Sequence, residues 1–271
     1  MRIIYLLLIT CQKFQIEWHH VFFLGIMSLL KFVLLMGKKV IIIPTYNEAQ
    51  NIASIIRRVR VYDKDSSILV VDDSSPDGTA DIVTGMMTND SKISLLLRKG
   101  KEGLGKAYLH AFKEVLMKNE TEWIQMLDAD FSHDPKYLPA MSKASNDADV
   151  VIGSRYVLGG GTAGWPFWRR FLSKFANFYC KVITGMPVND TTAGFVCMRT
   201  KIMREIGLDD IKSRGHAFQV ELKYRLWKKG ARIVEIPVIL PNRHLGNSKI
   251  SKRVIFESAW APWKMRLNKL I

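Results

Sequence analysis

Three short apolar runs, each ending in polar turn residues, constrain the fold of this chain more than any other feature. The runs at 40–43, 67–71 and 123–127 have the length and aliphatic content of buried strands. Further strands are expected at 92–97 and 149–152. Apolar residues at helical spacing predict helices at 49–61, 104–112, 135–145 and 217–229. This alternation predicts an α/β fold with a mostly parallel, doubly wound central sheet and helices on both faces.

Polar side chains follow all three runs. Asp128 and Asp130 stand one residue apart after the third run, Asp72 and Asp73 follow the second, and residues 44–48 follow the first. The carboxyl ends of parallel strands lie on one edge of a sheet, where α/β proteins bind their ligands. These loops are therefore predicted to meet at one nucleotide, with an aromatic ring for the base and a carboxylate for ribose or base donors.

Asp128 and Asp130 suit a metal ion. Carboxylate oxygens are the ligands that Mg²⁺ or Mn²⁺ prefers, and such an ion can bridge a diphosphate. An isolated Asp-x-Asp is more often an Asx turn that ends a strand, but the other polar strand ends favour the metal. His133 lacks a partner at ligand spacing and is expected to be a loop residue. The basic, glycine-containing loop 98–103 is either a phosphate contact or a solvated turn.

Length, charge and cysteine usage narrow the class of protein. The 271 residues, 48% of them hydrophobic, suit one large α/β domain with accessory segments. A formal net charge of +15 suits nucleic acid, anionic lipid or a phosphorylated substrate. Because the sequence contains no recognised nucleic-acid-binding motif, we expect a small phosphorylated ligand and no nucleic-acid partner. Cys11, Cys180 and Cys197 lack the spacing of a zinc site, which predicts packing roles in a reduced compartment.

The two ends of the chain differ in composition from the middle. Residues 1–36 form an apolar extension whose longest run is shorter than the roughly 20 residues of a membrane span. A membrane anchor, a signal peptide and a native start at Met36 all remain open, although no small-residue cleavage site supports the signal peptide. Residues 251–271 interleave basic and aromatic side chains, which favours a segment on an anionic membrane surface over a core helix. Pro262 interrupts this segment, so the sequence does not assure one straight helix there.

The order and spacing of several motifs resemble one known family. The first group of motifs occupies residues 42–48, 70–79 and 103–107, together with Asp128-Ala129-Asp130, and the later group occupies 153–156, 164–173, 190–195 and 242–250. Together they resemble the GT-A glycosyltransferases of family 2 and, within it, the polyprenol-phosphate (dolichol-phosphate) mannosyltransferases. The resemblance covers residues 40–250.

The resemblance implies a GT-A catalytic domain, a Rossmann-like nucleotide-diphospho-sugar transferase fold, over residues 37–250. It implies an inverting hexosyltransferase that moves mannose from GDP-mannose to a polyprenyl (dolichyl) monophosphate with the help of Mg²⁺ or Mn²⁺. Such an enzyme is expected at the cytoplasmic face of a membrane, bound peripherally or weakly anchored. A membrane-embedded partner subunit could supply the transmembrane helices that many relatives carry.

The resemblance also implies roles for individual residues. Donor binding is implied for Pro44, Tyr46, Glu48, Val71, Asp73, Asp128, Ala129, Asp130, Arg155, Arg243 and Lys249. Metal binding is implied for Asp128, Asp130 and Ser132, and acceptor-phosphate binding for Arg155, Arg169 and Ser173. The implied catalytic residues are Asp128, Asp130, Arg155 and Asp190. Asp190 is expected either to orient the substrate or arginine side chains, or only to cap its loop.

The chemistry of this reaction suits those residue types. A cation with Arg and Lys side chains neutralises the charge that develops on the leaving nucleoside diphosphate. The attacking phosphate oxygen is already anionic near neutral pH, so a strong general base is dispensable. Two alternatives stay open: a family relative with another donor, such as UDP-glucose, or another acceptor, and a membrane-bound sugar-nucleotide sensor without turnover.

Overall fold

The structure, a computed structural model, describes residues 39–213, 215–241 and 252–267. The N-terminal extension at 1–36 lies outside these ranges, as do Arg243 and Lys249.

A seven-stranded sheet lies at the centre of the described chain, in the order β3-β2-β1-β4-β7-β5-β8. Its strands are β1 (Lys39–Thr45), β2 (Ser67–Asp72), β3 (Ile93–Leu97), β4 (Trp123–Met126), β5 (Val150–Ser154), β7 (Val196–Arg199) and β8 (Ile233–Pro237). Neighbouring strands run parallel except at β7, which is antiparallel to both β4 and β5. A small parallel sheet pairs β6 (Gly161–Thr162) with β9 (Ile239–Leu240). The prediction of a mostly parallel α/β sheet is confirmed.

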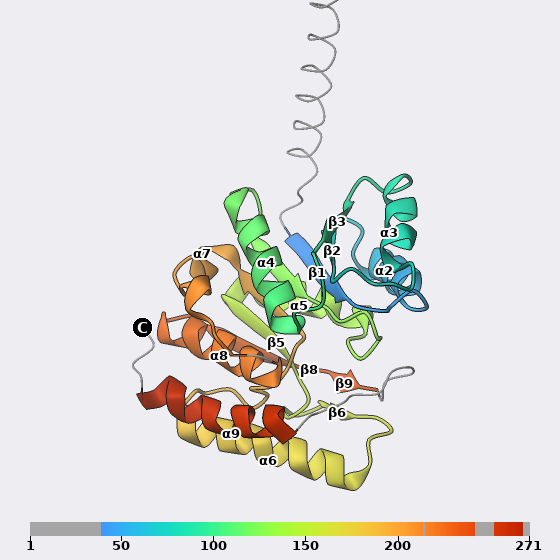
Figure 1. Cartoon of the computed structure of the whole chain (residues 1–271). Coiled ribbons are helices and arrows are strands. Elements are labelled where there is room, and N and C mark those ends of the chain that lie inside the picture. The colour runs from blue at the N-terminus through green and yellow to red at the C-terminus, as the bar shows by residue number, and fades with distance from the viewer. Residues whose placement is uncertain (1–38, 214, 242–251, 268–271) are drawn as a thin grey trace, which may run out of the picture. The chain divides into compact units, whose positions relative to one another are not determined.

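Helices cover both faces of the sheet, as expected (Figure 1). They are α2 (Ile52–Tyr62), α3 (Thr79–Met87), α4 (Leu104–Met117), α5 (Leu138–Ala144), α6 (Phe167–Thr184), α7 (Thr200–Met203), α8 (Gly215–Lys228) and α9 (Lys252–Leu267). Helices α2, α3 and α5 share one apolar cluster with alternate residues of the strands, so they form one layer. Helices α4 and α8 contact each other on the opposite face, where Tyr108 stacks on Phe218.

Helix α2 shows why the local sequence adopts this arrangement. Its apolar residues Ile52, Ile55, Ile56 and Val59 follow helical spacing, and each is at most 1% exposed. Burial of each such side chain stabilises the fold by about 1.5–3 kcal/mol. The opposite face of the helix carries Arg57 and other exposed residues.

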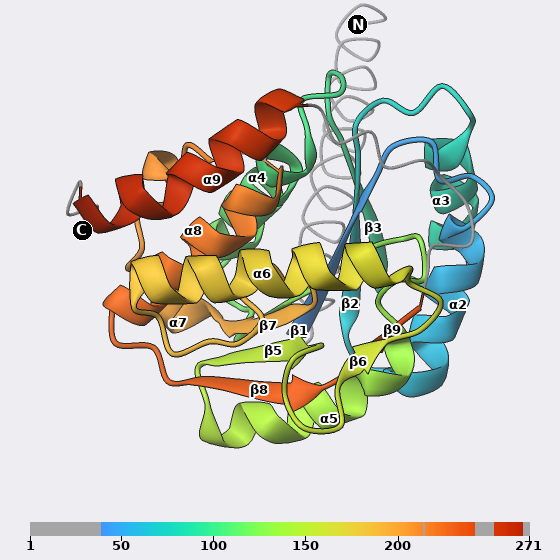
Figure 2. The same ribbon diagram turned by 90° about the horizontal axis from the view of Figure 1, so that it is seen from below.

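Helix α9 answers a question that Pro262 leaves open in the sequence. Pro262 lies inside it, yet Lys252–Leu267 forms one helix that runs beside α6 (Figure 1 and Figure 2). A proline removes one backbone hydrogen bond, and the burial of Ala261 and Met265 against α6 and α8 offsets that cost. Helix α9 therefore belongs to the same compact unit as the sheet. It both packs in a core and exposes Trp260 and Trp263.

None of the described helices is long and apolar enough to cross a lipid bilayer.

Candidate active site

The loops after β1, β2 and β4 lie at one edge of the sheet, as the sequence predicts. The three strands are parallel neighbours, and the ends of β1 and β2 are in register, with Thr45 opposite Asp72. The backbone N–H of Asp73 donates to the carbonyl of Thr45 at 3.1 Å, which joins two of the loops where they leave the sheet. Asp72 itself is fully buried and accepts the Thr45 hydroxyl at 2.7 Å. Its role is to hold the loops together.

Each of these three loops contains a non-glycine residue in the left-handed backbone region. The residues are Asn47, Ser74 and Phe131, with φ of 61°, 54° and 60°. This conformation is uncommon for a bulky residue such as Phe, and strained residues of this kind cluster at functional sites. At Phe131 the sharp turn brings the backbone N–H of Ser132 to within 3.0 Å of Asp130 Oδ1.

Asp128 and Asp130 both follow β4 but differ in exposure. The Asp128 side chain is 22% exposed, and its Oδ1 accepts the hydroxyl of Tyr108 at 3.3 Å. Burial, followed by the charge of Asp128, raises the pKa of Tyr108 well above its usual value, so this hydroxyl stays protonated and donates. Asp130 is only 9% exposed, and Ala129 between the two packs in the core. The two carboxylates are thus held by separate donors on a turn that the core anchors.

The donor chemistry of this pair fits a divalent cation. Both side chains present hard anionic oxygens, which suit Mg²⁺ or Mn²⁺ better than softer metals. Within the part of the chain that the structure describes, no three His, Cys, Asp or Glu side chains gather as a complete metal site. Two carboxylates fill only part of the coordination sphere of such a cation, and the oxygens of a diphosphate can fill other positions.

His133 is more than the loop residue that the sequence suggests. Its side chain is 4% exposed, and Nδ1 accepts the backbone N–H of Asp128 at 3.1 Å. The ring stacks on Phe195, with the centroids 5.2 Å apart. Gly194 passes directly over it: a Cβ at this glycine would lie 3.1 Å from His133 Cε1. His133 therefore fixes the backbone of Asp128 through this hydrogen bond.

The loops after β1 and β2 form the other side of the site. The ring of Tyr46 lies beneath the ammonium of Lys101, 3.9 Å from the ring centroid. Glu48 accepts the side-chain amide of Asn51 at 2.8 Å, and Pro44 is half-buried. Val71 is fully buried, so its side chain belongs to the core and only its backbone can face a ligand.

Asp73 is bound by Arg98, the first residue of the basic loop 98–103. Its carboxylate forms a buried ion pair with Arg98, and Oδ2 also accepts the backbone N–H of Glu102 at 3.3 Å. Arg98 in turn contacts the Glu102 carboxylate at 2.5 Å. Arg98 and Glu102 therefore fix the basic loop 98–103 to the end of β2, while Lys99 and Lys101 in the same loop are exposed.

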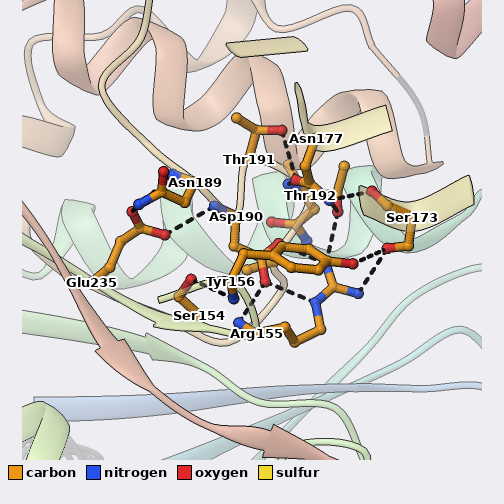
Figure 3. A network of polar contacts seen from close by, with 12 residues as sticks. Ser154, Arg155, Tyr156, Ser173, Asn177, Asn189, Asp190, Thr191, Thr192 and Glu235 are labelled. Carbon is orange, nitrogen blue, oxygen red and sulfur yellow. Dashed lines mark hydrogen bonds and ion pairs between the residues drawn. The ribbon is translucent and has the colours of Figure 1, made fainter. Parts of the chain in front are cut away.

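A buried arginine network forms a second part of the site (Figure 3). Asp190 is fully buried, and its two oxygens accept Arg155 Nε at 2.7 Å and Nη2 at 2.6 Å. The backbone N–H of Arg155 donates to the same carboxylate at 2.9 Å. Arg155 Nη2 also reaches the Thr192 hydroxyl at 2.8 Å. Because every Asp190 oxygen faces Arg155, this aspartate orients the guanidinium and is not exposed to solvent.

Helix α6 completes the arginine network. Ser173 accepts the hydroxyl of Tyr156 at 2.7 Å and lies 3.4 Å from Arg155 Nη1. The guanidinium of Arg169 stacks on the ring of Trp165, 3.8 Å from its centroid. The structure thus brings Arg155, Ser173 and Asp190 together, in line with the grouping expected from the sequence.

Solved structures with the same chain path define the class of fold. Glucosyl-3-phosphoglycerate synthase from Mycobacterium tuberculosis superposes with a TM-score of 0.59 at 15% identity, over 88% of this chain and 83% of that one. A mannosyltransferase from Pyrobaculum calidifontis, solved with GDP-Man and Mn²⁺, gives 0.53 at 16% identity, over 83% and 70%. The fold is the GT-A fold of glycosyltransferases.

Sequence comparison gives the family. Residues 40–207 match the model of glycosyl transferase family 2. The undecaprenyl-phosphate mannosyltransferase of Micrococcus luteus is 40% identical over 217 residues, which cover 80% of this chain and 89% of the relative. The polyprenol monophosphomannose synthase of Mycolicibacterium smegmatis is 39% identical over 233 residues, covering 84% and 88%. The chain belongs to glycosyl transferase family 2.

Proposed function

We propose that this protein transfers mannose from GDP-mannose to a polyprenyl phosphate and so forms polyprenyl phosphate mannose. The observation that carries the proposal is the 40% identity to an undecaprenyl-phosphate mannosyltransferase across 89% of that relative. The geometry supports it, because a carboxylate pair suited to a metal diphosphate and a buried arginine network belong to one family 2 domain.

The donor side of the proposed site centres on Asp128 and Asp130. A bound Mg²⁺ or Mn²⁺ would neutralise the charge that develops on the leaving diphosphate. Asp128 and Asp130 hold that ion, and Ser132 contributes its backbone N–H to Asp130 at 3.0 Å, which orients the second carboxylate. We assign the nucleotide pocket to Pro44, Tyr46, Glu48, Val71, Asp73 and Ala129, with Arg243 and Lys249 from the stretch outside the described residues.

The acceptor side centres on Arg155, with Arg169 and Ser173. Cationic groups of this kind bind a phosphate and hold its oxygen for attack on the sugar. Asp190 is a positioning residue here, since the ion pair at 2.6 Å occupies it fully. No side chain is required to remove a proton, because the attacking phosphate oxygen is already anionic.

Helices α6 and α9 expose apolar side chains that suit binding to a lipid surface. Helix α6 exposes a stripe of large apolar side chains, and the neighbouring helix α9 exposes three more. We call this set the α6–α9 apolar face; it comprises Phe167, Trp168, Phe171, Leu172, Phe175, Phe178, Val182, Trp260, Trp263 and Leu267. Large exposed apolar patches are unusual on a monomer and mark interaction surfaces. Exposed Arg170 and Lys174 flank the stripe. We assign this face to the anionic cytoplasmic surface of a membrane, where aromatic and basic side chains bind together.

A donor panel tests the proposed reaction. Purified protein is incubated with Mg²⁺ or Mn²⁺, polyprenyl phosphate and labelled GDP-mannose, UDP-glucose or UDP-N-acetylglucosamine. We expect a labelled lipid only with GDP-mannose, and none after chelation of the metal. A labelled lipid from UDP-glucose would instead support a relative with another donor. Saturable binding of GDP-mannose without any product would support the sensor.

A further inference from the structure

Lys223 on α8 is fully buried, although lysine is among the residues least often found inside a protein. Its ammonium donates to three backbone carbonyls: Thr191 at 3.0 Å, Ala193 at 2.6 Å and Gln219 at 3.0 Å. Three acceptors match the three donors of an ammonium group, so the buried charge is fully hydrogen-bonded. Two of the three carbonyls belong to the loop 190–194, which is far from Lys223 in the sequence.

This loop touches both halves of the proposed site. Asp190 and Thr192 hold the guanidinium of Arg155, on the acceptor side. Two residues further on, Gly194 passes against the imidazole of His133, which supports Asp128 on the metal side. Lys223 binds the carbonyls of Thr191 and Ala193, the two residues that lie between Asp190, Thr192 and Gly194 in the sequence. The ammonium thus binds one side of the loop, and the residues on the other side contact Arg155 in the acceptor half and His133 in the metal half of the proposed site.

We propose that Lys223 is a positioning residue that fixes the loop 190–194 and thereby sets Arg155 for the acceptor phosphate. The effect on the reaction rests on the proposed function, whereas the effect on the loop does not. Lys223 does not touch substrate, since its ammonium is enclosed by backbone.

Charged groups surround Lys223 from several elements. Asp190 in the loop, Glu235 on β8 and Cys180 on α6 favour the charged form, whereas Arg155 after β5 opposes it. Burial is the largest influence and lowers the pKa of Lys223 to about 7. Opening of the loop would return the amine to water and to its ordinary pKa, so opening takes up a proton between pH 7 and pH 10.5. The loop is therefore expected to open less often as the pH rises above neutrality.

A matched pair of variants tests the proposal. Lys223→Met removes the ammonium that holds the loop. Arg225→Met removes another buried cation of the same helix, one that binds the carbonyls of Ile206 and Asp210 and not the loop 190–194. A general loss of stability would affect both variants alike. We expect Lys223→Met to lower kcat/KM for polyprenyl phosphate about tenfold or more, with Arg225→Met within about threefold of wild type.

Amide hydrogen exchange provides a readout that needs no turnover. We expect faster exchange at Arg155, whose backbone N–H donates to Asp190, and across 190–194 in Lys223→Met but not in Arg225→Met. If Lys223→Met does not fold, the same amides in the wild-type protein are followed from pH 6 to 8.5, after correction for intrinsic rates. A gain of protection with rising pH is then expected, because opening that solvates Lys223 takes up a proton. Unchanged protection in the variant, or across that pH range, overturns the proposal, even if the protein fails to transfer mannose.

Discussion

The imidazole Nδ1 of His133 accepts the backbone N–H of Asp128 at 3.1 Å, so a side chain from the loop after β4 fixes the first aspartate of the pair. The contact requires a lone pair on Nδ1, which places the ring proton on Nε2. Stacking on Phe195 keeps the ring in place. The position of Asp128 in the proposed metal site thus depends on a hydrogen bond from its backbone to His133.

His133→Phe tests this support. The new ring can keep the stacking on Phe195 but cannot accept the Asp128 N–H, which becomes an unsatisfied buried donor. We expect the free energy of unfolding to fall by about 1–3 kcal/mol and kcat/KM to fall about tenfold. Urea unfolding and initial rates measure the two effects. The exposed His110 on α4 supplies the control, His110→Asn, and equal activity in both variants would show that the contact has no catalytic importance.

Asp128→Asn and Asp130→Asn test the metal pair. Each change removes a negative charge that the proposed cation needs, so we expect kcat/KM to fall about 100-fold or more. Stabilisation of the protein by GDP with Mn²⁺, followed as a shift in Tm, should disappear. Asp134→Asn is the control, because Asp134 lies in the same loop but pairs with Arg58 at 3.2 Å. A normal Tm shift in both pair variants would refute the assignment.

Asp190→Asn tests the buried arginine network. The change leaves the Arg155 guanidinium buried without its counter-charge, which costs about 3–5 kcal/mol of unfolding free energy. Ser173→Ala removes only a hydroxyl and should cost about 1 kcal/mol. Both variants should raise KM for polyprenyl phosphate. Chemical denaturation and acceptor titrations measure the effects, and a stability loss of the same size in both would contradict the buried-charge explanation.

The pH dependence of stability follows from the lowered pKa of Lys223. In the fold its pKa is about 7, below the ordinary value of 10.5 that applies when the chain unfolds. Between these values the unfolded chain binds one more proton, so the contribution of Lys223 to unfolding free energy becomes more favourable as pH rises. We expect the difference between wild type and Lys223→Met to grow in favour of wild type from pH 7 to pH 9. Urea unfolding at each pH measures it, and a constant or shrinking difference would count against a lowered pKa.

The α6–α9 apolar face predicts lipid binding. Phe171 and Phe178 are 63% and 65% exposed, so Phe171→Ser with Phe178→Ser should leave Tm unchanged. Cosedimentation with vesicles of phosphatidylcholine and phosphatidylglycerol should fall several-fold, because each exposed aromatic ring contributes apolar area at the interface. Leu158→Ser is the control, since Leu158 is fully exposed but lies outside α6 and α9. Undiminished cosedimentation of the double variant would assign the face to another occupant, such as a partner subunit.

The strand ends could be predicted because their signal is local. Runs such as 67–71 have the length and aliphatic content of a buried strand, and the polar residues that follow each run mark its carboxyl end. Strand β7 is not predicted from the sequence, because the short run Val196–Arg199 directly follows a Thr-rich turn and carries no distinct pattern. The pairing of β7 with β4 and β5 is decided by contacts distant in the chain.

The residues that hold the loops of the site in place could not be predicted, because their partners are also distant in the chain. In the sequence, Arg98 belongs to a loop that is either a phosphate contact or a solvated turn, and Lys223 lies in a predicted helix without an assigned role. In the structure the two residues are 6% and 0% exposed. Their partners, Asp73 and the carbonyls of Thr191 and Ala193, come from other elements. Spacing along the chain carries no information about such pairs. The residues that a ligand touches leave a local pattern, whereas those that hold them in place do not.

The reversed direction of β7 has a practical consequence for engineering this enzyme. Because β7 is antiparallel to β5, the end of β5 and the start of β7 lie at the same edge of the sheet, the edge that carries the proposed site. The proposed donor and acceptor sites lie at that rim, so insertions there are expected to impair catalysis. The turns that precede β3 and β8 lie at the opposite rim, and an epitope or fluorescent label spliced there, near Asn89 or Gly230, should leave catalysis intact.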